Sequence, residues 1–142
     1  TRRRGFSQAM RDCGIPEDPR LIAQCRAWTE EEGDRALGAL LDAGTDVTAV
    51  VAAHDRLALG CFAALEARGL RCPEDVSVVG FNDMPFMDKM RPPLTTVRVE
   101  HYDVGAESAR MLLDVLAHPS RGARTVFLPT SLVVRGSTGP VR

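Results

Sequence analysis

The chain has 142 residues, 44% of them hydrophobic, which is enough for one domain with a substantial core. Its 18 Lys plus Arg and 19 Asp plus Glu give a net charge of -1, so the charge gives no reason to expect nucleic acid or an anionic membrane as a direct partner. No apolar run approaches the roughly 20 residues that span a bilayer, and the amino end lacks a signal pattern. We therefore expect a cytoplasmic protein without a membrane partner.

The cysteines and histidines do not suggest a cofactor. Four cysteines are widely spaced, without a Cys-x-x-Cys or a nearby His pair, and the three histidines are scattered. Ordinary reduced thiols are favoured over a disulfide or a redox role. We expect neither a metal nor another cofactor.

The first residues are predicted to form the body of a helix. Phe6 and Met10 share one face, and Gly14 is placed as a C-terminal stop. The basic triplet Arg2 to Arg4 has two explanations, a solvated helix face or a phosphate-binding patch, and a solvated face is the commoner one.

A strand and a helix are predicted next. Residues 21–27 are apolar enough for a strand that ends at Trp28. Thr29 and Glu32 then form the pattern of a capping box, and Gly44 closes the helix.

The same alternation continues with a βαβ unit. Residues 47–53 predict a strand that ends in His54 and Asp55, and residues 57–68 predict a helix closed by Gly69. The apolar run 76–83 predicts a second strand, buried on both faces, as in a parallel sheet covered by helices. The expected fold is a three-layer αβα arrangement with a mainly parallel sheet.

The second half of the chain is predicted to be less regular. Residues 84–93 are rich in proline and methionine and should form a loop. We expect a strand over 94–99, a long amphipathic helix over 101–117, and short strands over 125–128 and 132–134.

The predicted strands end in a set of polar and aromatic side chains that should share one edge of the sheet, where α/β folds bind ligands. An indole, an imidazole, an amide and carboxylates suit a small polyhydroxylated ligand, since planar polar groups engage hydroxyl pairs and the indole stacks on a sugar or base. The set is Trp28, His54, Asp55, Asn82 and Asp83.

Each member also has a purely structural explanation. Trp28 could belong to the core, Asp55 could be the N-cap of the next helix, and Asn82 or Asp83 could cap a loop. Catalysis by His54 and Asp55 is disfavoured, because neighbouring residues at a strand end point apart and no nucleophile elbow is present. Binding is therefore the favoured function, and we do not expect an enzyme.

Four segments carry a resemblance to a known family. They are VVAAHDRLALG (50–60), CPEDVSVVGFND (72–83), PPLTTV (92–97) and LVVRGST (132–138). In this order and spacing they resemble the ligand-sensing domain of lactose-repressor-like (LacI/GalR) bacterial transcription regulators, over nearly the whole chain.

The resemblance implies a periplasmic-binding-protein-like fold of two α/β lobes with the effector in the cleft, preceded by a helix-turn-helix DNA-binding head. Residues 1–97 would be mostly the C-terminal lobe, residues 98–130 a helix and strand that cross to the N-terminal lobe, and residues 131–142 the C-terminal strand and tail. The head and most of the N-terminal lobe would be absent from this chain. Helix 101–117 would then lack its usual neighbour, so we expect a partner chain or an altered docking to cover it.

The resemblance also implies roles for individual residues. Arg2 matches the arginine that engages the effector, and Trp28 matches the aromatic residue that stacks on it. Asn82 stands where most relatives have Asp, and His54, followed by the matching Asp55, stands where many have Asn. These departures indicate a ligand other than a plain hexose.

The implied function is allosteric. A sugar, a related polyol, or else a nucleoside or purine would bind and alter operator binding by a full-length homodimer that meets through the helix after Asp55 and the loop 84–93. The alternative is a periplasmic sugar-binding protein of a transport system, and an enzyme comes third.

Overall fold

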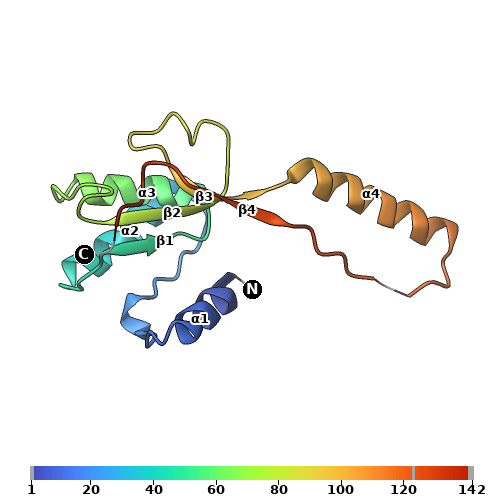
Figure 1. Ribbon diagram of the computed structural model, residues 1–142, viewed down its shortest axis with the longest axis horizontal. Helices are drawn as coiled ribbons and strands as arrows, with labels where there is room; N and C mark the ends of the chain where they lie inside the picture. Colours follow the sequence, from blue (N-terminus) through green and yellow to red (C-terminus); the bar gives the residue numbers. More distant parts are fainter. Residues whose placement is uncertain (1, 123, 141–142) are drawn as a thin grey trace.

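A computed structural model describes residues 2–122 and 124–140. The helices are α1 (Arg2–Asp12), the 3-10 turn η1 (Pro19–Leu21), α2 (Glu30–Asp42), α3 (Asp55–Glu66) and α4 (His101–Ala117), and the strands are β1 (Ala49–Val51), β2 (Ser77–Asn82), β3 (Thr95–Val99) and β4 (Thr130–Val133). Figure 1 shows a lobe that contains the sheet, α2 and α3, with α1 set apart below β1 and α4 projecting far from the sheet.

The strands form one mixed sheet in the order β1-β2-β3-β4. The first two pairings are parallel, with Val51 opposite Val79 and Val79 opposite Thr95, and β3 pairs with β4 antiparallel. The predicted α/β fold with a mostly parallel sheet flanked by helices is confirmed.

The core lies where α3 packs on β2 and against α2. Its fully buried members include Ala58, Ala64, Val78 and Leu94. Leu57, Val76 and Val78, which helped to predict these elements, belong to this core. Val79 and Phe81 on β2 are only half-buried, so the strand that was expected to be buried on both faces is fully buried on one.

Two glycines allow α2 and α3 to approach closely. A Cβ atom on Gly60 would lie 1.9 Å from the carbonyl oxygen of Glu30, and one on Gly33 would lie 2.1 Å from the carbonyl oxygen of Leu57. Each helix therefore presents a glycine to the backbone of the other, and no larger residue fits at either position.

The C-terminal segment is tied into the sheet through the buried Ser137. Its hydroxyl donates to the carbonyl of Val78 (2.6 Å) and accepts from the N–H of Thr95 (2.8 Å), and its carbonyl accepts from the N–H of Val78 (2.8 Å). The segment after β4 thus connects the amino ends of β2 and β3.

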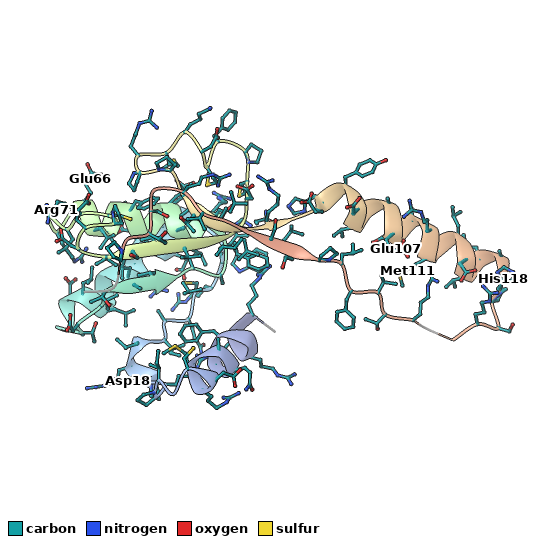
Figure 2. The ribbon with its side chains drawn as sticks, in the orientation of Figure 1. Asp18, Glu66, Arg71, Glu107, Met111 and His118 are labelled. Carbon is teal, nitrogen blue, oxygen red and sulfur yellow. The ribbon has the colours of Figure 1, made fainter. Side chains whose placement is uncertain are left out.

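Helix α4 and the segment that returns to β4 form a long arm (Figure 1). No α4 residue is buried, and Leu113 and Leu116 are each 66% exposed. Figure 2 shows Glu107 and Met111 on the side of α4 that faces the returning segment. An ion pair of 3.6 Å joins Glu107 on α4 to Arg124 on the returning segment. The chain's own sheet does not cover α4, and its coverage by a partner chain or by an altered docking stays a prediction.

Two predicted strands are not observed. Residues 22–27 are irregular after η1, because side chains of α2 satisfy their backbone groups: Glu32 accepts from the N–H of Arg26, and Arg35 donates to the carbonyl of Gln24. Residues 125–128 are irregular because β3 gives way to α4 at His101, which leaves no strand beside them.

Candidate ligand-binding site

The candidate site lies at the carboxyl ends of β1 and β2. Because the two strands are parallel, His54 after β1 and Asn82 at the end of β2 reach the same edge. Trp28 also lies at this edge, directly before Thr29, the N-cap of α2. The Thr29 hydroxyl accepts a hydrogen bond from the N–H of Glu32 (3.3 Å). Half of the predicted capping box is present, since the Glu32 carboxylate is used elsewhere, on the N–H of Arg26.

Three of the predicted site residues are in direct contact. The rings of Trp28 and His54 are stacked, with centroids 5.1 Å apart and planes 15° from parallel. The guanidinium carbon of Arg2 lies 5.1 Å from the Trp28 centroid and 4.2 Å from the Phe81 centroid. Arg2 therefore makes cation–π contacts with two aromatic rings, and one of these, Phe81, is not among the predicted site residues.

Trp28 is not a core residue. Its side chain is 54% exposed, and its ring contacts Arg2 and His54. The alternative explanation of Trp28 as part of the core does not hold.

His54 is the N-cap of α3, a role that the sequence suggested for Asp55. Its Nδ1 atom accepts a hydrogen bond from the N–H of Arg56 (3.2 Å). Burial lowers the pKa of His54 from its ordinary value, and the positive charges of Arg2 and Arg56 lower it further, against the opposing effect of Asp55. His54 is accordingly neutral near pH 7, with its proton on Nε2.

Asp55 is turned into the protein and is completely buried. One carboxylate oxygen accepts from the hydroxyl of Thr96 (2.6 Å) and the other from the N–H of Met84 (2.7 Å). Gly80 makes room for it, since a Cβ atom there would lie 2.3 Å from the nearer carboxylate oxygen. Asp55 thus joins the start of α3 to β3 and to the loop after β2.

Asp83 is also occupied by the protein. Its carboxylate, 7% exposed, binds Arg98 on β3 (2.7 Å) and Arg135 after β4 (2.8 Å). Burial raises the pKa of Asp83, but the hydrogen bonds and charges of the two arginines outweigh it and hold the pKa below its ordinary value. Asp83 therefore fixes the end of β2 to both neighbouring segments.

Asn82 remains a free group at the edge. Its φ of 123° and the φ of 52° at Asp83 lie in the region that residues other than glycine rarely adopt. Within the described part of the chain, the Asn82 amide makes no hydrogen bond. The strained backbone thus presents an unpaired amide beside Phe81.

The comparisons with known proteins agree with this geometry. A family model described as a periplasmic binding protein-like domain matches residues 1–138. The chain is 37% identical over 137 residues to the HTH-type transcriptional repressor CytR of Escherichia coli, covering 96% of this chain and 40% of that protein. The chain therefore spans well under half the length of this curated relative.

Solved structures show the same fold. A complex of the transcriptional regulator CelR with cellobiose matches with a TM-score of 0.88 and 35% identity, over 94% of this chain and 40% of that one. A LacI family regulator from Enterococcus faecium with bound ribose matches with a TM-score of 0.82 and 31% identity, over 97% and 50%.

The fold is an α/β lobe with aromatic and polar side chains clustered at the carboxyl ends of β1 and β2. The chain belongs to the periplasmic binding protein-like domains of LacI-family transcription regulators.

Proposed function

We propose that this chain is the effector-sensing lobe of a transcription regulator, and that a small carbohydrate-like ligand binds at the edge formed by Arg2, Trp28, His54 and Asn82. The stack of Arg2, Trp28 and His54 at the carboxyl ends of the strands is the observation that carries this proposal. A planar aromatic surface beside donors and an amide is typical of sugar recognition. The cellobiose and ribose bound in the two related structures support the same ligand class.

A catalytic role is not supported by the arrangement. His54 uses Nδ1 to cap α3, and both oxygens of Asp55 are engaged by Thr96 and Met84, so the two residues do not form an acid and base pair. The relatives are regulators, which favours a sensor over both an enzyme and a transport binding protein.

In the complete protein we propose that ligand binding changes operator affinity. The relative CytR is an HTH-type repressor, which supports a DNA-binding head outside this segment. Residues 1–97 would form the C-terminal lobe, and residues 98–130 would reach the other lobe. A ligand that binds one lobe arrangement more tightly than the other changes the affinity for DNA. By linkage, DNA binding changes the affinity for the ligand by the same factor.

We further propose a homodimer in the cytoplasm, formed through α3 and the loop 84–93. Phe86, which belongs to this loop, is 74% exposed and has a φ of 73°. In the described part of the chain, no helix has the length and apolar character needed to pass through a bilayer.

The test is a titration of the full-length protein with cellobiose, ribose, other sugars, polyols, nucleosides and purines, followed by Trp28 fluorescence and by operator binding. We expect at least one compound to change both signals, and the Trp28→Phe variant to lose the fluorescence response. Operator binding that responds to none of them would contradict the proposal.

A further inference from the structure

The carboxylates at the ligand edge are not available to a ligand. Asp55 is completely buried with both oxygens engaged, and Asp83 is 7% exposed and bound by two arginines. A neutral sugar needs hydrogen-bond acceptors as well as donors from its site, because each hydroxyl carries a proton to donate. Carboxylates are the strongest acceptors a protein can offer, and here both are already used.

The groups that remain are mainly donors. The Trp28 indole N–H can only donate. His54 accepts with Nδ1 from the N–H of Arg56, so the proton of its neutral ring is on Nε2, which donates. The Arg2 guanidinium donates and carries a full charge, and only the Asn82 amide can also accept.

The contacts of the Arg2 guanidinium are with aromatic rings. Within the described residues Arg2 has no carboxylate partner, and its contacts are the faces of Trp28 and Phe81. These contacts leave the edge of the guanidinium, with its planar set of N–H groups, able to bind a carboxylate or phosphate in two parallel hydrogen bonds. The edge therefore presents a guanidinium without a carboxylate partner among the described residues and, among Arg2, Trp28, His54 and Asn82, more donors than acceptors.

We propose that the ligand is a carbohydrate that bears an anionic group, either a carboxylate or a phosphate, and that Arg2 binds this group. The inference rests on the proposed function and narrows its ligand class. The sugar ring stacks on the exposed part of Trp28, the His54 Nε2–H and the Asn82 amide bind its oxygens, and Arg2 binds the anion. A neutral sugar would leave the charge of Arg2 unmatched.

Matched ligand pairs test this inference by calorimetry on the full-length protein. The pairs are ribose with ribose 5-phosphate, glucose with glucuronate, and galactose with galacturonate, and the charged member of each pair can keep the sugar ring. We expect an anionic member to bind at least tenfold more tightly than its neutral partner, with an advantage that shrinks as salt increases. Comparing the ligand that bears a phosphate with those that bear a carboxylate shows which anionic group the site prefers.

Two variants test whether Arg2 causes the preference for the anionic ligand. Arg2→Gln should remove most of the preference, so that the anionic and neutral members of a pair bind within about threefold of each other. The control Arg4→Gln removes the same charge from an exposed position of the same helix and should leave the preference intact.

The outcomes that would overturn the inference are separate from those that bear on the proposed function. If the neutral members bind as tightly as the anionic ones, the inference fails and the sugar sensor stands. If inorganic phosphate alone binds as tightly as ribose 5-phosphate, the site is a general anion site and the inference fails. If no member of any pair binds, and the broader panel also fails to alter operator binding, both fail.

Discussion

Asp55 shows how a residue near a ligand edge can serve the fold rather than the ligand. It is completely buried, yet its neighbour His54 takes the role of N-cap that a carboxylate would ordinarily fill. The carboxylate instead satisfies Thr96 and the N–H of Met84, two groups that are distant in the sequence.

Removing this carboxylate should destabilise the lobe. Asp55→Ala leaves the Met84 N–H and the Thr96 hydroxyl without partners, and we expect a loss of about 3 kcal/mol in the free energy of unfolding, measured with urea. Asp55→Asn keeps one acceptor and should cost about 1 kcal/mol. The exposed Asp46→Ala is the control and should change stability by less than about 0.5 kcal/mol. Equal losses for all three variants would contradict the assignment.

His54 should make both the emission of Trp28 and the stability of the lobe depend on pH. Because burial and nearby arginines lower the pKa of His54 in the folded protein, the unfolded chain takes up the proton first as the pH falls. Its contribution to stability is therefore complete above its ordinary pKa of 6.5 and is lost as the pH falls below that value. Since a protonated imidazole quenches a stacked indole, Trp28 emission should fall with a midpoint below pH 6.5.

The matched control is His54→Asn, which can still cap α3 through its carbonyl oxygen. It should abolish the titration of Trp28 emission over this range, whereas His118→Asn, on the arm, should leave it unchanged. A midpoint above 6.5 in the unsubstituted protein would show that His54 is protonated more easily than the structure implies.

At the scale of elements, the contact between α2 and α3 depends on reciprocal glycines. A methyl group at Gly60 would lie 1.9 Å from a backbone oxygen, so the helices must separate to admit it. We expect Gly60→Ala to lower the free energy of unfolding by about 3 kcal/mol, more than the gain in helix propensity offsets.

Gly5→Ala on α1 is the control for this substitution. A Cβ atom at Gly5 has no neighbour within 4 Å, so the same change should raise stability by about 0.5 to 1 kcal/mol. Thermal unfolding of the two variants should shift in opposite directions. A shift of the same sign for both would mean that α2 and α3 are not in close contact.

The elements that could be predicted from the sequence are those with local signals. Thr29 and Gly44 mark the ends of α2, and α4 begins and ends where its apolar period predicts. The strand expected over 21–27 does not form, because the side chains of Glu32 and Arg35 bond to backbone groups of this segment. Such tertiary contacts leave no local pattern in the sequence. In the candidate site, His54 could be predicted from the end of a strand, whereas Trp28 was expected at the end of a strand that does not form and lies just before the cap of α2. The partners of Asp55 and Asp83 lie too far along the chain to be predicted.

At the scale of the whole molecule, the arm makes the chain unusually exposed. The accessible surface is 9673 Å². A compact protein of this mass would expose about 7,200 Å². Leucines and valines along α4 contribute to this excess, and an apolar stripe of this kind favours association.

We therefore expect the 142-residue chain to self-associate as its concentration rises, and the double variant Leu113→Glu with Leu116→Glu to do so less. Sedimentation velocity measures the difference. Ala109→Glu adds a charge to the same helix without removing a leucine and should have a smaller effect. Equal association by all three proteins would place the contact elsewhere.

The antiparallel pairing of β3 with β4 also makes the arm a separable insertion. Val99 and Thr130 face each other across the ladder, so the chain leaves the lobe and returns to it at one point, while Ser137 fastens the C-terminal segment to the sheet. Replacing residues 100–129 with an Asn-Gly turn should give a miniature lobe that unfolds cooperatively and keeps the Trp28 and His54 stack. Circular dichroism and Trp28 emission would check this. The arm is then an exchangeable module, and arms from related proteins could be grafted at the same two residues without redesigning the lobe.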